Sequence, residues 1–249
     1  MTLMAENTDP AVQPVVEGVS QKTFPDTVVM IPTLNEEEAI ETIISETREC
    51  GFTRILVVDG FSSDGTKVVA ANGGAKVVDQ EFGKGKGCGV RTGMRLFLEE
   101  PAVVLCIIDG DGTNVPADLI DMRSMLQAGD ADVVLGSRTR GRRESGAMNW
   151  LSLISNRTVS FLLAAKFRRY FTDIQTGYWA FTRPAVQRVY PNIQSMGFEI
   201  ELELFTKSLQ EGLRVEELPV RFRRRKGRTK FNFKLRLRNL YYAFKFLSS

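Results

Sequence analysis

The 249-residue chain contains no histidine, and this absence removes several kinds of chemistry at once. Ser-His-Asp and Cys-His mechanisms need an imidazole base, and many zinc sites need an imidazole ligand. Any reaction that this protein catalyses must therefore depend on carboxylate, lysine and arginine side chains.

Cysteine is scarce. Cys50, Cys88 and Cys106 lie far apart and form no C-x-x-C pair. This spacing argues against a zinc site or a disulfide framework and is typical of a reducing compartment. We therefore expect a cytoplasmic protein with free thiols.

Long apolar runs are also missing. No window reaches about 18 uninterrupted apolar residues, so we expect no transmembrane helix. Residues 1–24 are polar and lack a basic start followed by an apolar stretch, which predicts a disordered extension and not a signal peptide. With 43% hydrophobic and 25% charged residues, the chain has the composition of an ordinary globular domain.

Positive charge is concentrated at one end of the chain. Residues 212–249 contain 12 Lys and Arg against 2 Asp and Glu, although the whole protein has a net charge of only +3. The rest of the chain is therefore acidic. A basic tail on an acidic body suggests an anionic partner such as nucleic acid, phosphate or lipid headgroups.

Short β-branched runs alternate with segments of helical periodicity from residue 27 onward. We expect strands at 27–32, 54–59, 75–80, 102–109 and 131–137, and helices at 35–51, 64–72, 89–100, 115–129 and 148–167. This alternation predicts a Rossmann-like α/β fold with a mostly parallel sheet flanked by helices. Ligands in such folds bind beyond the carboxyl ends of the strands.

The regular alternation of strands and helices ends after about residue 140. The stretch "DIQTGYWAFT" (173–182), a helix near 199–211 and strands around 214–224 continue the same domain. Residues 230–247 mix lysine and arginine with aromatic residues, which predicts a basic amphipathic helix at the C-terminal end.

Two acids follow the fourth strand in "IIDGDGTN" (107–114). Their i, i+2 spacing turns the carboxylates of Asp109 and Asp111 to one side. Two hard oxygen ligands at this position suit Mg²⁺ or Mn²⁺, which would also remove their mutual repulsion. The alternative is a solvated Asp-Gly turn, a common loop sequence.

Further candidates for anion or nucleotide binding lie at strand ends and in loops. Asp59 ends the second strand and could accept hydrogen bonds from a nucleobase or ribose, unless it only shapes a turn. Lys86 lies in the glycine-rich stretch 83–89, which suits an anion but lacks the Ser or Thr of a P-loop. Arg138 ends the fifth strand as a phosphate clamp or an ordinary surface residue. The arginine-rich stretch 221–230 suits phosphate or an anionic membrane.

These motifs, in this order, resemble the GT-A glycosyltransferases of family 2, and most closely the dolichyl-phosphate sugar synthases. The resemblance covers residues 27 to about 232 and depends on "IPTLNE", "VVDGFSSDGT", "GKGKG", "DGDG", "GSR", "TDIQTGYWAF", "GFEIELEL" and "LPVRFRRRKGRTKF".

The resemblance implies a role for several residues. The expected nucleotide-sugar-binding residues are Pro32, Leu34, Glu36, Asp59, Lys86 and Asp109. Asp109 and Asp111 would form the D-x-D pair that holds Mg²⁺ or Mn²⁺ on the donor diphosphate. Asp111 and Arg138 are the expected catalytic residues, and Arg157, Arg223 and Lys230 would bind the acceptor or its phosphate.

Two departures bear on the donor. The mannose synthases have V-D-D-G-S where this chain has Gly60 and Phe61, and often a glutamine where this chain has Thr113. The versions present here look more like dolichyl-phosphate hexose synthases that use UDP-glucose or a UDP-N-acetylhexosamine. We therefore expect these donors, with GDP-mannose as the alternative.

The expected activity is metal-dependent, inverting transfer of a hexose from a nucleotide sugar to dolichyl or polyprenyl phosphate, for protein N-glycosylation or cell-surface glycan assembly. Residues 25–230 would form the GT-A domain, and residues 231–249 a helix at the membrane interface. The segment 148–167 is either a second interfacial element or an ordinary core helix. The protein would be peripheral on the cytoplasmic face of the membrane.

The sequence is also compatible with two other interpretations. One is a glycosyltransferase with a soluble acceptor. The other is a nucleic-acid-binding module, which we disfavour because an acidic strand-end cleft repels phosphate, so no nucleic-acid partner is expected.

Overall fold

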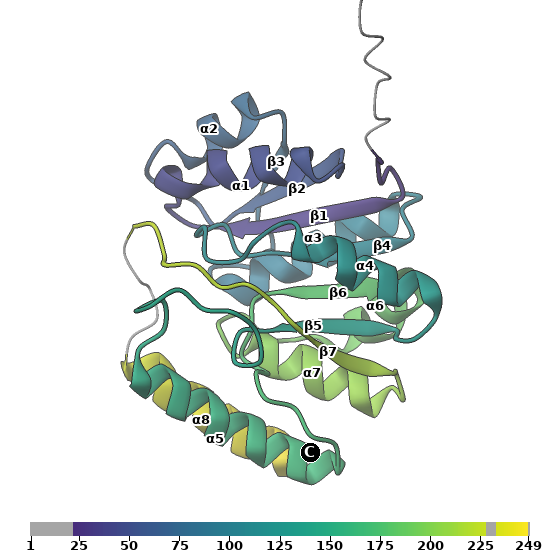
Figure 1. Ribbon diagram of the computed structural model, residues 1–249, viewed down its shortest axis with the longest axis vertical. Coiled ribbons are helices and arrows are strands. Elements are labelled where there is room, and N and C mark those ends of the chain that lie inside the picture. Colours follow the sequence, from purple (N-terminus) through teal and green to yellow (C-terminus); the bar gives the residue numbers. More distant parts are fainter. Residues whose placement is uncertain (1–21, 228–232, 249) are drawn as a thin grey trace, which may run out of the picture.

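A computed structural model describes residues 22–227 and 233–248 of the chain. In this part of the protein, seven strands form one sheet in the order β3-β2-β1-β4-β6-β5-β7 (Figure 1). The strands are β1 (Thr27–Thr33), β2 (Arg54–Asp59), β3 (Lys76–Asp79), β4 (Val104–Ile107), β5 (Val133–Ser137), β6 (Trp179–Thr182) and β7 (Val215–Pro219). Only β6 is antiparallel to its neighbours, so the predicted mostly parallel sheet is confirmed.

The helices agree with the sequence pattern within a few residues. They are α1 (Glu37–Glu49), α2 (Thr66–Asn72), α3 (Lys86–Glu99), α4 (Asp118–Ala128), α5 (Trp150–Phe167), α6 (Arg183–Val189), α7 (Ile200–Gln210) and α8 (Phe233–Ser248), with a 3-10 turn at Tyr190–Asn192. The short helix α6 was not expected from the sequence. Thr182 caps it through a bond from the Ala185 N–H, and Pro184 occupies its first turn.

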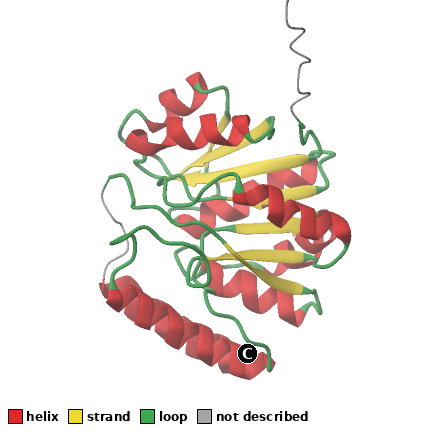
Figure 2. Ribbon diagram, viewed as in Figure 1, coloured by secondary structure: helices red, strands yellow, loops and turns green. Residues whose placement is uncertain are grey.

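Helices cover both faces of the sheet (Figure 2). Side chains of β1 alternate between two cores: Val28 and Met30 enter one, and Val29 and Ile31 enter the other. Helices α1, α2 and α4 close the second core, while α3, α5, α6, α7 and α8 close the first. Burial on both faces is why these strands read as continuous apolar runs.

Because β6 is antiparallel, the loop before it lies where the parallel strands end. It pairs with β4 through Ile107 and Trp179, so β6 begins where β4 ends. The loop before β6, residues 172–178, therefore lies beside the "DGDG" stretch. Gly177 allows the closest approach, since a Cβ at this position would lie 2.0 Å from Asp109 Oδ2.

The predicted C-terminal helix is present as α8, which runs side by side with α5 (Figure 1). Asn239 and Ala243 of α8 are buried, and Ala243 belongs to the same apolar core as β1 and α3. Within the described residues, no helix combines the length and apolar character needed to cross a bilayer.

Candidate active site

A cavity of about 510 Å³ opens at the edge where β1, β4 and β5 end. It brings together residues that lie far apart in the sequence. Of the predicted site residues, its walls include Pro32, Leu34, Glu36, Lys86, Asp109, Asp111 and Arg138. Other lining residues are Asn156, Gln175, Phe198, Glu201, Arg225 and Asn239.

Lys86 is the central cation of this cavity. Its Nζ lies 2.7 Å from Asp109 Oδ1 and 2.6 Å from Glu201 Oε1. Burial by itself would lower the pKa of Lys86, but the two carboxylates outweigh that effect and raise the pKa above its ordinary value of 10.5. Burial also raises the pKa of Glu201, an effect that Lys86 opposes. Lys86 is therefore a fixed positive charge at neutral pH.

Asp111 is held from two sides. Its Oδ1 accepts hydrogen bonds from the Thr113 N–H at 3.0 Å and from the Thr113 hydroxyl at 2.6 Å. Its Oδ2 forms an ion pair with Arg225, whose Nη2 also lies 2.6 Å from Glu36 Oε1. Arg225 thus joins the second acid of the "DGDG" stretch to Glu36, the residue before α1.

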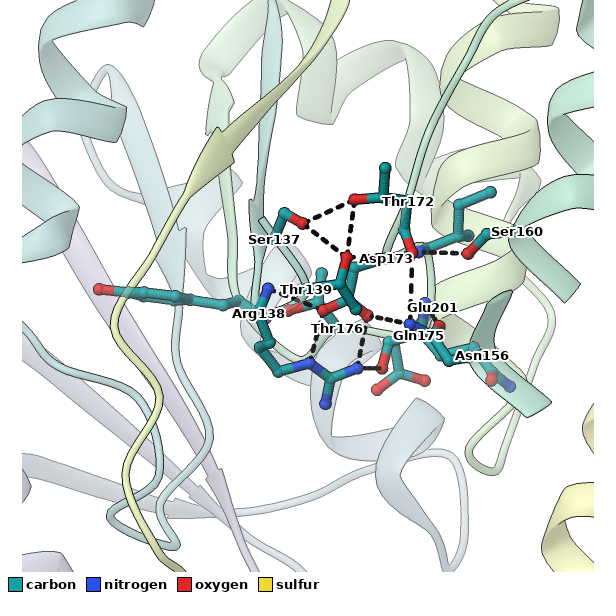
Figure 3. A network of polar contacts seen from close by, with 12 residues as sticks. Ser137, Arg138, Thr139, Asn156, Ser160, Thr172, Asp173, Gln175, Thr176 and Glu201 are labelled. Carbon is teal, nitrogen blue, oxygen red and sulfur yellow. Dashed lines mark hydrogen bonds and ion pairs between the residues drawn. The ribbon is translucent and has the colours of Figure 1, made fainter. Parts of the chain in front are cut away.

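Arg138 lies in a network of polar contacts with the loop before β6 (Figure 3). Its Nε and Nη2 donate to the two oxygens of Asp173 at 2.8 and 2.6 Å, and its backbone N–H donates to Asp173 as well. Asn156 adds a further bond to Asp173 at 2.7 Å. Burial would lower the pKa of Arg138, but Asp173, Asp109 and Glu201 raise it. The guanidinium is therefore charged and held rigidly at the cavity wall.

Asp59 is placed differently from the other predicted residues. It is fully buried at the end of β2, where its oxygens accept bonds from the Thr33 hydroxyl, the Ser62 N–H and the Ser62 hydroxyl at 3.1, 2.7 and 2.6 Å. Thr33 and Gly60 line the cavity, whereas Asp59 does not. Asp59 thus shapes the wall of the pocket from behind.

The predicted phosphate-binding residues do not gather in this cavity. Arg157 is exposed on α5 and lines a second cavity. Arg223 forms an ion pair with Glu46 of α1 at 2.8 Å. Lys230 lies outside the described residues.

Residues 220–227 are called here the basic segment. Their ion pairs with acids elsewhere in the chain explain part of the uneven distribution of charge along the sequence. This segment leaves β7 and crosses the strand ends toward α1 (Figure 1). Arg221 pairs with Asp118 at 2.7 Å, and Lys226 donates to Thr42 at 3.2 Å. The ion pairs of Arg221, Arg223 and Arg225 neutralise acids of the chain itself.

Sequence reasoning missed Glu201, Arg225 and Asp173 as site residues. Glu201 and Asp173 lay inside motifs that carried the family resemblance, but neither follows a strand of the parallel sheet. The run of arginines in "RFRRRKG" gave no sign of which one faces Asp111. Their positions depend on contacts between segments up to 189 residues apart.

The residues present fit a divalent cation. Among the described residues, no group of three or more His, Cys, Asp or Glu side chains is placed to hold a metal ion. Asp109 and Asp111 offer hard oxygen ligands to the cavity, and Arg225 shows that a positive group is accommodated against Asp111. A cation that takes its other ligands from water and phosphate, as Mg²⁺ does, suits such a site.

The sheet order and the acidic pair at the end of β4 define a GT-A type glycosyltransferase fold. In agreement, glucosyl-3-phosphoglycerate synthase from Mycobacterium tuberculosis, crystallised with Mn²⁺, UDP and glucosyl-3-phosphoglycerate, superposes with a TM-score of 0.70. It is 18% identical, and the match covers 89% of this chain and 80% of that one. At this identity the likeness shows the fold alone.

Residues 28–190 match the family described as glycosyl transferase family 2, and the chain belongs to this family. It is therefore a glycosyltransferase. Glycosyltransferase AglJ of Haloferax volcanii is 37% identical over 199 residues, which are 80% of this chain and 63% of the relative. A dolichyl-phosphate hexose transferase from the same organism is 30% identical over 218 residues, 86% of this chain and 90% of the relative.

Proposed function

We propose that this glycosyltransferase transfers a hexose from a nucleotide sugar to the phosphate of a dolichyl or polyprenyl lipid, with inversion at the anomeric carbon. The observation that carries the proposal is the cavity in which two carboxylates at the end of β4 face Lys86, Arg138 and Arg225. Such a site suits a ligand with several phosphate charges and a bound cation. The name of the 30% identical relative supports a dolichyl-phosphate acceptor.

The chain supplies positioning and charge. Pro32, Leu34 and Glu36 would contact the nucleoside, while Lys86 and Arg138 would stabilise the departing diphosphate. Asp109 and Asp111 would hold Mg²⁺ or Mn²⁺, which when bound would add positive charge to that diphosphate. The acceptor phosphate, whose second pKa is about 6, is already an anion near neutral pH, so the absence of histidine is no obstacle.

Gly60, Phe61 and Thr113 favour UDP-glucose or a UDP-N-acetylhexosamine over GDP-mannose, and the structural neighbour was crystallised with UDP. Thr113 replaces a longer side chain and holds Asp111 by two hydrogen bonds. The products would serve protein N-glycosylation or cell-surface glycan assembly, at the cytoplasmic face of a membrane to which the protein binds peripherally.

The test is a panel of UDP-glucose, UDP-N-acetylglucosamine and GDP-mannose, each with dolichyl phosphate in detergent micelles and with Mg²⁺ or Mn²⁺. We expect transfer from one of the UDP-sugars and at least a hundredfold loss in Asp111→Asn, roughly the effect of removing a group that stabilises transition-state charge. Asp130→Asn is the matched control. Asp130 is exposed and precedes β5, at the end of this strand that is opposite to the active site. Transfer only to a soluble acceptor, or full turnover by Asp111→Asn, would refute the proposal.

A further inference from the structure

A second cavity, of about 790 Å³, lies between α5, the loop that follows it and the residues after β5. It shares no lining residue with the active-site cavity. Four arginines contribute to its walls: Arg140, Arg157, Arg168 and Arg169. None of its described lining residues is acidic, although Glu216 and Glu217 lie beside it and pair with Arg169 and Arg140.

Two of these arginines have no side-chain hydrogen bond or ion pair with any residue that the structure describes. Arg169 lies 2.9 Å from Glu216 Oε1, and Arg140 donates to the Glu217 carbonyl oxygen at 3.2 Å. Within residues 22–227 and 233–248, no hydrogen bond or ion pair involves the side chains of Arg157 or Arg168, whereas most arginines of the basic segment are neutralised by acids of the chain. The cavity therefore offers two guanidinium groups that no acid of the described residues neutralises.

The rim of this cavity is apolar. Phe161 and Tyr170 line it with exposed fractions of 70% and 86%. Trp150 and Ile154 are also exposed, at 67% and 55%. Ile154 lies four residues after Trp150 and seven before Phe161, so all three lie on the same face of α5. An apolar helix face beside unpaired cations is complementary to a membrane surface, with acyl chains below and phosphate groups above.

We infer that this cavity binds the phosphate headgroup of an anionic membrane lipid that is not a substrate. The inference rests on the proposed membrane association but not on the identity of the sugar or of the acceptor. The hydroxyls of Thr139 and Thr172, 2.8 Å apart, lie between this cavity and the Arg138–Asp173 pair of the active site. A lipid bound here orients the active-site cavity relative to the bilayer.

The experiment measures cosedimentation of the full chain with phosphatidylcholine vesicles, with and without added phosphatidylglycerol. We expect binding only when phosphatidylglycerol is present, and about a tenfold loss of affinity in Arg157→Lys/Arg168→Lys, because lysine keeps the charge but loses the two-pronged contact with phosphate. Lys166→Gln, on the same helix but outside the cavity, should lose about fivefold at most. Wild-type affinity in the lysine double variant would show that the protein binds the vesicles by nonspecific electrostatic attraction, and it would overturn the inference.

Two further arms separate the sources of the anion. Inorganic phosphate that raises the Tm of the wild type but not of Arg168→Gln, without any binding to vesicles, would assign the cavity to a soluble phosphate and overturn the lipid. An arginine-dependent gel shift with single-stranded RNA and no vesicle binding would do the same. Transfer by the wild type in micelles is measured separately, so loss of the proposed function leaves a vesicle-binding result standing.

Discussion

The ammonium group of Lys86 lies 2.7 Å from Asp109, so the first acid of the "DGDG" stretch has a permanent counter-charge from the start of α3. Glu201 of α7 shares the same ammonium group at 2.6 Å. Because three helix and strand ends meet at this cation, Lys86 contributes to stability as well as to the site.

Replacing Lys86 by methionine should destabilise the fold. The change leaves Asp109 and Glu201 facing each other without a counter-charge, and loss of one partner of a buried ion pair costs about 3 kcal/mol or more. Urea unfolding at pH 7 measures the change. Lys76→Met, which removes an exposed lysine paired with Glu100 at 3.2 Å, is the control and should stay within about 0.5 kcal/mol.

The same variant predicts a pH dependence. Folding raises the pKa of Lys86 above 10.5, so its contribution to stability is complete below pH 10.5 and is lost as the pH rises through the folded value. The difference in unfolding free energy between wild type and Lys86→Met should therefore stay constant from neutral pH to about pH 10 and narrow above it. A difference that shrinks between pH 7 and pH 9 would contradict the assignment.

Arg225 should compete with a divalent cation. Its guanidinium group contacts Asp111 and Glu36, so Arg225→Gln should bind Mn²⁺ about tenfold more tightly in the absence of nucleotide. Electron paramagnetic resonance of free Mn²⁺ gives the affinity directly. Arg224→Gln is the matched control, because the Arg224 side chain donates to the Ser145 carbonyl oxygen instead. Equal affinities in the two variants would show that Arg225 does not occupy the cation position.

The Arg138–Asp173 pair predicts that replacing Arg138 by lysine lowers stability more than replacing Arg140 by lysine. Asp173 is fully buried and receives both prongs of Arg138, a geometry that lysine cannot reproduce. Arg138→Lys should lower stability by about 3 kcal/mol. Arg140→Lys should change it by less than about 0.5 kcal/mol, because Arg140 is half exposed and lies 3.7 Å from Glu217. Thermal unfolding of the two variants side by side decides the point.

Removal of residues 231–249 should destabilise the protein. Asn239 and Ala243 of α8 are buried, and Leu240 and Tyr242 pack on the core cluster, so truncation exposes apolar surface of α5 and α7 at a cost of about 5 kcal/mol. Differential scanning calorimetry measures the loss. Tyr241→Ser, on the exposed side of α8, should leave the Tm nearly unchanged. An unaltered Tm in the truncated protein would show that α8 contributes no packing.

The strands, most helices and the acidic edge of the sheet could be predicted because each depends on neighbours in the chain. Val103 to Ile107 read as a buried strand from composition, and the i, i+2 spacing of Asp109 and Asp111 fixed their common side. The place of β6 could not be predicted. The sequence of its four residues does not indicate whether the strand is parallel or antiparallel. Its insertion between β4 and β5 depends on the packing of the whole sheet.

The sequence by itself determined the fold class, the acidic pair at the end of β4 and the chemistry that a chain without histidine can perform, because periodicity and composition are local properties. Only the tertiary structure decided which cation each acid receives. Lys86 meets Glu201, and Arg225 meets Glu36, across 115 and 189 residues, where no sequence spacing acts. The tertiary structure also placed Arg157 in a second cavity. It brought much of the basic segment into ion pairs with acidic residues of the chain. Charge partners are chosen by proximity in three dimensions, since electrostatic attraction depends on distance and burial and not on order along the chain.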